Sequence, residues 1–206
     1  MFLLGKFKSS MEAANEAIKI RRDWELDFLF GKISVALGDS QKAAEYFSQS
    51  LEFEPNEESY IELAQIYISQ KRFEKAYTLL KEAIRYSEEN PTLYEMLGLL
   101  AVRLGKVAEA SVDFTVCLEA DPFDFNALLG LGSIMQAKNE IDEAILKYKY
   151  AFTVSPNSSF LWNNAGMCFF EKQKLIAAYT CITKSIYLDP FQWKSYANLG
   201  LVCLEL

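Results

Sequence analysis

The chain has 206 residues, of which 51% are hydrophobic and 24% are charged, and its formal net charge at pH 7 is −7. With only 9 Gly and 5 Pro, this composition is typical of a folded protein and excludes the disordered and collagen-like classes. The excess of acidic residues argues against a nucleic acid as the main partner, because phosphate backbones are bound by basic side chains.

The sequence contains no run of about 18 apolar residues, the length that a membrane-spanning helix needs. Its first residues also lack the basic stretch followed by an apolar stretch that begins a signal peptide. We therefore expect a cytoplasmic chain with no direct membrane insertion.

Histidine is absent from the chain, which removes the most common general base and the most common metal ligand. The four cysteines are Cys117, Cys168, Cys181 and Cys203, and no two of them form a C-x-x-C pair. Without histidine, a closed zinc site would need all four cysteines from widely separated positions. We therefore expect no metal, no cofactor, no disulfide and no enzymatic activity.

A period of 34 residues runs through the sequence. Pro122, Pro156 and Pro190 are 34 residues apart. Small residues recur in two series with nearly the same period, one twelve residues after the other. The first series is Gly31, Ala64, Gly98, Gly132 and Gly166, and the second is Ala43, Ala76, Ala110, Ala144 and Ala178. This is the period of the tetratricopeptide repeat (TPR), an antiparallel pair of helices, which we call helix A and helix B.

The repeats follow one another along the chain. The end of a first repeat is expected at 1–23, with its helix B at about 8–20. Full repeats are expected at about 24–56, 57–90, 91–123, 124–157 and 158–191, followed by a partial repeat at 192–206. Helix A is expected at about 24–37, 57–70, 91–104, 124–137, 158–171 and 192–205, and helix B at about 40–53, 73–86, 107–120, 141–153 and 175–187.

Residues that begin and end helices support these limits. The expected N-caps are Asn56, Asn90 (before Pro91), Asp124 and Asn157. Gly38 and Gly105 are expected to end helix A in a left-handed conformation. Because the chain opens on the tail of a helix A and stops after another helix A, we expect it to be part of a longer protein.

The repeated small residues predict close packing within each helix pair. We expect the small residue of helix A to face the small residue of helix B, with large apolar side chains on either side. Leucine precedes the small residue of helix A at Leu63, Leu97, Leu131 and Leu199. Each pair would bury one face internally and another against its neighbour. We therefore predict an all-α, right-handed superhelical TPR solenoid of about six repeats in a single array.

A TPR solenoid offers a concave surface lined by its A helices. On that surface we expect the residues three before, one after and four after the small residue of each helix A. The candidate partner-binding residues are Phe28, Lys32, Val35, Ile61, Gln65, Ile68, Glu95, Leu99, Asn163, Met167 and Phe170. The same rule places Val102, Leu129, Ser133 and Gln136 there. Packing against a neighbouring helix is the alternative role for each of them.

Two specific modes of peptide binding are disfavoured by the sequence. A clamp for a terminal carboxylate needs several Lys, Arg and Asn side chains in one groove, and Lys32 is nearly alone. A ladder of asparagines that grips an extended backbone would need Asn two residues before the small residue of helix A in successive repeats. Only Asn164 and Asn198 meet that requirement.

Several sequence segments resemble one TPR family closely. They are residues 162–172 (WNNAGMCFFEK), 188–194 (LDPFQWK), 198–202 (NLGLV), 132–136 (GSIMQ) and 2–6 (FLLGK). These segments, in the same repeat phase, resemble the family of the fourth Bardet–Biedl syndrome protein, a TPR subunit of the BBSome. The resemblance is most specific after residue 130.

The resemblance implies a non-catalytic scaffold that acts in the trafficking of ciliary membrane proteins and in cilium assembly. It implies other subunits of a BBSome-like complex as partners, together with centriolar satellite and dynein–dynactin components. It also implies a location at the cilium, basal body, centrosome or centriolar satellites. The alternatives are a general TPR adaptor that binds peptides, or the TPR module of a larger enzyme or multisubunit complex.

Overall fold

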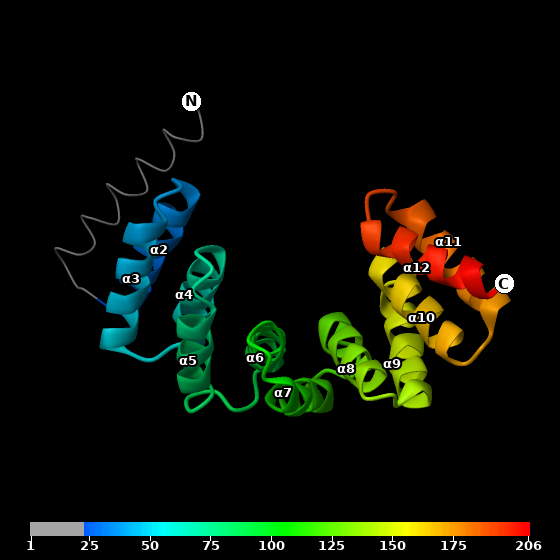
Figure 1. Cartoon of the computed structure of the whole chain (residues 1–206). Helices are drawn as coiled ribbons and strands as arrows, with labels where there is room; N and C mark the ends of the chain where they lie inside the picture. The colour runs from blue at the N-terminus through cyan, green and yellow to red at the C-terminus, as the bar shows by residue number, and fades with distance from the viewer. Residues whose placement is uncertain (1–22) are drawn as a thin grey trace. The chain divides into compact units, whose positions relative to one another are not determined.

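The computed structural model of the chain describes residues 23–206, which contain helices and turns and no strand (Figure 1). The helix expected at about 8–20 lies outside the described residues, as does nearly all of the partial repeat at 1–23. The chain divides into two compact units, residues 1–104 and 105–206, and each is described by itself.

The first unit contains five helices among its described residues. They are α2 (Trp24–Ala36), α3 (Ser40–Phe53), α4 (Glu57–Ser69), α5 (Phe73–Ala83) and α6 (Pro91–Arg103). Helix α2 packs on α3 and α4 packs on α5, so each expected helix pair is formed. Contacts of α3 with α4 and of α5 with α6 join each pair to the next repeat.

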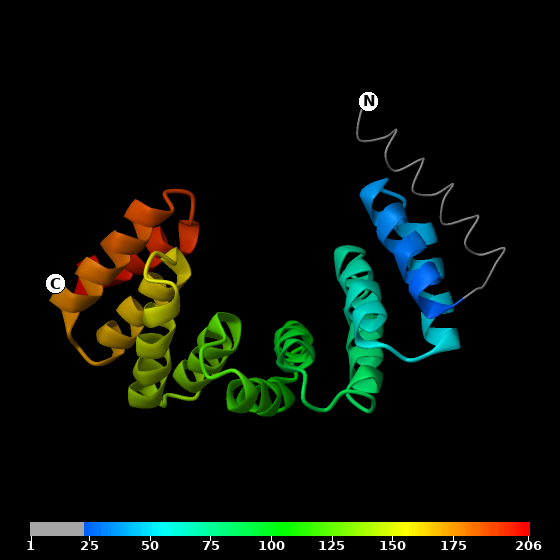
Figure 2. The same cartoon turned by 180° about the vertical axis from the view of Figure 1, so that it is seen from behind.

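The second unit continues the same order. Its helices are α7 (Val107–Ala120), α8 (Phe125–Ala137), α9 (Ile141–Val154), α10 (Ser159–Glu171), α11 (Leu175–Leu188) and α12 (Trp193–Glu205). The pairs α8–α9 and α10–α11 form the repeats, and contacts of α7 with α8, α9 with α10 and α11 with α12 connect them. Views from opposite sides show these neighbours lying side by side within the unit (Figures 1 and 2). The all-α TPR solenoid predicted from the 34-residue period is confirmed.

Most predicted helix ends agree with the structure within one or two residues, and α5 is the exception. It ends at Ala83 and not at about residue 86. Residues 84–86 form a tighter turn, in which the amides of Arg85 and Tyr86 bond the carbonyl oxygens three residues before them.

The caps also agree with one exception. Asn56, Asn90 and Asp124 accept a hydrogen bond from an amide in the first turn of α4, α6 and α8, respectively. The prediction for Asn157 is wrong, because Ser158 begins α10 and its hydroxyl accepts from the Leu161 amide. Ser158 is one residue closer than Asn157 to the free amides of the first turn.

Within residues 23–206, every turn from helix A to helix B contains a residue in the left-handed conformation. Gly38 has φ 79° and Gly105 has φ 74°, as expected. The equivalent positions in the other repeats hold residues with a side chain and the same conformation: Lys71 (φ 60°), Asn139 (φ 65°) and Gln173 (φ 57°). The turn geometry is therefore common to the five repeats that the structure describes, although the residue type is not.

The close packing within two of the helix pairs differs from the small-against-small arrangement that the sequence predicts. A Cβ on Gly31 would lie 2.4 Å from the Phe47 ring, and one on Gly132 would lie 2.5 Å from the Tyr148 ring. Each large residue is four positions after the small residue of helix B. At these two positions the glycine makes room for an aromatic ring of the partner helix. At Gly166 a Cβ would lie 2.6 Å from Cγ1 of Ile182 and 3.3 Å from the backbone oxygen of Ala178, so here the small residue of helix A does approach the small residue of helix B.

Two junctions between repeats enclose hydrogen-bonded serines. Ser50 in α3 donates to the Trp24 carbonyl oxygen (3.0 Å) and accepts from the Ser59 hydroxyl of α4 (2.9 Å). Ser185 in α11 donates to the Ser159 carbonyl oxygen (2.7 Å), and the Ser195 hydroxyl of α12 lies 2.8 Å away. The equivalent pairs elsewhere are apolar: Ala83 and Leu93, Cys117 and Ala127, and Ala151 and Leu161. Serine thus occurs on both sides of a junction or on neither side.

Candidate functional site

The candidate surface of the first unit is formed by α2, α4 and α6. Its exposed members are Val35 (44% exposed), Leu99 (40%) and Val102 (45%), together with Lys32 and Gln65. Phe28, Ile61, Ile68 and Glu95 are half-buried. The expected positions therefore reach the surface to different degrees, and the apolar side chains that do so lie toward the C-terminal ends of α2 and α6.

Phe28 contributes mainly to the core of the first unit. Its ring centroid lies 5.6 Å from that of Phe47 and 6.4 Å from that of Trp24. It packs against the buried cluster that includes Phe47 and Leu63. A partner could touch only the exposed part of this ring.

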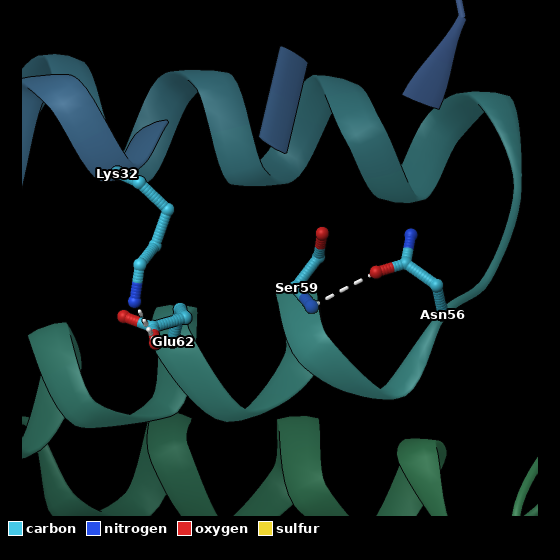
Figure 3. Close-up of polar contacts among 4 residues, drawn as sticks. All are labelled: Lys32, Asn56, Ser59 and Glu62. Atoms are coloured by element: carbon cyan, nitrogen blue, oxygen red, sulfur yellow. Dashed lines mark hydrogen bonds and ion pairs between the residues drawn. The ribbon is translucent and has the colours of Figure 1, made fainter. Parts of the chain in front are cut away.

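Lys32, the basic residue expected on this surface, is held by an ion pair (Figure 3). Its Nζ lies 2.7 Å from Oε1 of Glu62, which belongs to the next helix A. The side chains are 48% and 21% exposed, so the pair adds little to stability, but it joins α2 to α4. A peptide carboxylate would have to displace Glu62 to reach Lys32, which further disfavours a carboxylate clamp.

Glu62 lies two residues before the small residue of helix A. In the second unit, two residues at the equivalent position also contact the preceding helix A. Asn164 Nδ2 of α10 donates to Ser133 Oγ of α8 at 3.3 Å. Asn198 Nδ2 of α12 donates to Asn163 Oδ1 of α10 at 2.9 Å. These asparagines join consecutive A helices and are already hydrogen-bonded, so the ladder considered from the sequence serves the solenoid itself.

Asn163 does not lie open on the surface of α10, contrary to the exposure expected of a groove residue. It is 6% exposed, and its Oδ1 accepts from both Ser195 and Asn198 while its amide donates to Asn164. The helical spacing brings Asn163, Met167 and Phe170 to one side of α10. Met167 and Phe170 are half-buried against the cluster of Ala178, Ile182 and Val202.

Two exposed apolar residues beside the candidate surface were missed by the positional rule. Leu29 on α2 is 44% exposed, and Phe160 on α10 is 57% exposed. Phe160 lies one helical turn before Asn164 and two turns before Met167, so it shares their side of α10. That spacing was the signal in the sequence that could have found it.

Three of the four cysteine thiols are buried. Burial raises the pKa of the Cys168 thiol to about 12, and burial also raises the pKa of Cys181. Burial likewise raises the pKa of Tyr148 to about 12. Cys117 is buried and Cys203 is exposed. A thiol with a raised pKa is a poor nucleophile because it carries little thiolate at neutral pH.

Residues 23–206 contain no group of three or more Asp, Glu and Cys side chains placed to hold a metal ion. Within the same residues, no helix is long and apolar enough to cross a bilayer. What the A helices present is a mixture of aliphatic, aromatic and amide side chains. Such a surface can bind a protein segment through apolar contact.

Comparison with known protein families matches the tetratricopeptide repeat at residues 34–100 and again at residues 95–159. The crystal structure of YrrB, described as a TPR protein with an unusual peptide-binding site, superposes with a TM-score of 0.77. The alignment covers 90% of this chain and 96% of YrrB at 20% sequence identity, which shows a shared fold.

Curated relatives extend over the whole chain. The BBSome complex member BBS4 of Bos taurus is 38% identical over 207 residues, which cover 100% of this chain and 40% of the relative. The BBS4 homolog of Drosophila melanogaster is 27% identical over 216 residues, which cover 98% of this chain and 44% of the relative. The chain thus spans less than half the length of these relatives.

Proposed function

Since this chain belongs to the tetratricopeptide-repeat family and is homologous over its whole length to part of BBS4, we propose that it is a scaffold segment of a BBSome-type complex. It binds other protein subunits and carries out no chemistry. The observation that carries the proposal is the homology along all of α2–α12, together with an apolar surface on the A helices.

The surface supports contact with protein and not with a charged ligand. Val35, Leu99 and Val102 are each 40–45% exposed, and burying such side chains against a partner is favourable at roughly 25 cal/mol per Å². Lys32 is already paired with Glu62. An apolar partner segment therefore fits this surface better than the carboxylate end of a peptide.

The family resemblance also suggests a cellular role, a location and further partners. The scaffold acts in the trafficking of ciliary membrane proteins and in cilium assembly. It is placed at the cilium, basal body, centrosome or centriolar satellites, and centriolar satellite and dynein–dynactin components are among its partners. The resemblance supports these assignments.

Affinity purification from ciliated cells tests the proposal. The tagged protein should co-purify with BBSome subunits in fixed stoichiometry. Replacing Leu99 and Val102 together by Glu should weaken this association at least about tenfold, because both lie on one face of α6. The matched control is Val112→Glu on α7, a residue that is 62% exposed and lies on a B helix.

Co-purification that is unaffected by the α6 substitutions would contradict the assignment of the A helices as the binding surface. A protein that enters no complex but binds short peptides weakly, with strong dependence on salt, would instead be a general TPR adaptor. Far-ultraviolet circular dichroism must be unchanged in both variants, so that loss of binding is separated from loss of fold.

A further inference from the structure

A hollow lies between α9 and α10, on the side of α10 away from the candidate binding surface. It is a cavity of about 230 Å³ lined by Ile145, Tyr148, Lys149, Phe152, Ala165 and Phe169. Phe169 and Met167 project from nearly opposite sides of α10, because each residue of a helix is rotated by about 100° from the last. The cavity is therefore separate from the surface proposed above.

An unusual residue in the repeat opens this cavity. The position just before the small residue of helix A holds Phe30, Leu63, Leu97, Leu131 and Leu199 in the other repeats. In this repeat it holds Ala165, which is 6% exposed. Replacing a buried leucine by alanine leaves space that the surrounding core fills only in part.

The equivalent junction of the first unit, between α3 and α4, provides a comparison within the chain. There the hollow between α3 and α4 is larger, about 510 Å³, and its lining includes Gln41, Glu45, Ser48 and other polar residues. Leu63, the equivalent of Ala165, belongs to the buried cluster with Ala43 and Phe47 and does not line this hollow. An apolar hollow thus forms at the junction where the leucine is missing.

Two aromatic residues that line the α9–α10 cavity are fixed by contacts with other residues of the second unit. The Phe152 ring meets the Trp162 ring edge-on, with 4.7 Å between the ring centroids. Tyr148 is 1% exposed, and its hydroxyl donates to Gln136 Oε1 at 3.1 Å. Because these contacts fix the two rings, the cavity is already formed without a ligand.

Size and charge define what the cavity can accept. An apolar cavity of about 150 Å³ binds benzene, so this one is large enough for one aromatic or leucine side chain. Lys149 contributes its aliphatic stem to the wall, is exposed, and has no ion pair within residues 23–206. A basic group at the mouth of an apolar cavity favours an acidic residue beside the inserted side chain.

We propose that the cavity between α9 and α10 receives one large apolar side chain of a partner protein, next to an acidic residue that pairs with Lys149. The inference rests on the proposed role as an assembly scaffold and adds a second contact to it. A large side chain that fills a preformed apolar pocket is the kind of contact that dominates binding between proteins.

Titration of the chain with short peptides tests the pocket directly. The probe is an acetylated heptapeptide with a central Phe between two Glu residues, and the signals are the methyl carbons of Ile145 and Ala165 in nuclear magnetic resonance spectra. These signals should shift in a saturable way. Peptides with Ser in place of Phe, or with Lys in place of both Glu residues, should bind at least about tenfold more weakly.

Ala165→Leu fills the cavity with the residue that four of the other five repeats carry. It should weaken binding of the Phe peptide at least about tenfold, while the melting temperature stays the same or rises. Lys149→Glu should also weaken binding. Its control, Lys147→Glu, makes the same charge change on the opposite side of α9 and should have no effect. If Ala165→Leu does not fold, the pair of lysine variants decides the matter.

Absence of shifts with the Phe peptide, or equal binding by Ala165→Leu, would overturn the proposal. Concentration-dependent dimerisation that Ala165→Leu abolishes would also overturn it, because the occupant would then be a second copy of this chain. Failure of the wild-type protein to co-purify with BBSome subunits would refute the proposed function instead, whatever the peptide result.

Discussion

Replacing Gly132 by Ala should destabilise the second unit, although alanine is the better helix former. Gly132 lies in the middle of α8, where alanine would ordinarily stabilise the helix by about 0.5–1 kcal/mol. Here the new Cβ would lie 2.5 Å from Cε1 of Tyr148 and 2.9 Å from its Cδ1. Carbon atoms do not approach so closely, so the ring or the helix must move.

The Tyr148 ring has little room to move. It is 1% exposed, belongs to the buried cluster with Leu128 and Leu161, and is tethered through its hydroxyl to Gln136. Overpacking of a well-packed core costs about 1–3 kcal/mol. After the gain in helix propensity is subtracted, the free energy of unfolding should fall by about 0.5–2 kcal/mol.

Urea and thermal unfolding, followed by circular dichroism at 222 nm, provide the assay. The melting temperature should fall by about 1–8 °C, since 1 kcal/mol corresponds to about 2–4 °C for chains of this size. The matched control is Gly200→Ala in α12, where a Cβ would meet nothing within 4 Å. This control should be more stable than the wild type by about 0.5–1 kcal/mol.

A double substitution identifies the cause. In a Tyr148→Leu background, Gly132→Ala should cost little or even stabilise, because the ring that it displaces is gone. If Gly132→Ala alone is as stable as the wild type, or if its cost is the same in both backgrounds, the packing of the glycine against the ring is refuted.

Three further predictions concern turns, junctions and pH. Lys71→Gly should raise the free energy of unfolding by up to about 1 kcal/mol, because φ is 60° there, and a lower urea midpoint would contradict this. Ser185→Ala should lower it by about 1–2 kcal/mol, since the buried Ser195 hydroxyl loses a partner; the matched variant Ser48→Ala, at a half-buried serine of α3, should cost less. Burial raises the pKa of Tyr148 and of Cys168 to about 12, so the unfolded chain loses these protons at a lower pH than the folded chain. The free energy of unfolding should therefore keep its full value below about pH 9 and fall as the pH rises toward about 12. A urea midpoint that is the same at pH 8 and pH 11 would contradict the last prediction.

The repeat period was enough to predict the fold, because helix pairs of 34 residues recur with the same small residues and caps. The sequence did not show which residue each glycine faces, since Ala144 and Tyr148 lie on the same side of α9 and only packing decides between them. It also could not show that Lys71 and Gln173 adopt the left-handed turn of Gly38, because neither residue type favours that conformation.

The candidate site was less predictable for a physical reason. A positional rule finds which side of a helix faces the groove, but not which polar residues are already paired across it. Asn163 is buried and accepts hydrogen bonds from Ser195 and Asn198. These two residues lie 32 and 35 positions further along the chain, in α12. Such pairings depend on the distance between repeats, which one sequence does not reveal.

Hydroxyl-radical footprinting of the protein, alone and within the purified complex, tests the central claim most directly. We predict that Val35, Leu99, Val102 and Met167 lose reactivity in the complex, because partner subunits cover the A helices, while the exposed Val112 of α7 stays reactive. Unchanged reactivity of Val35, Leu99 and Met167 in a complex that contains the protein in fixed stoichiometry would contradict it.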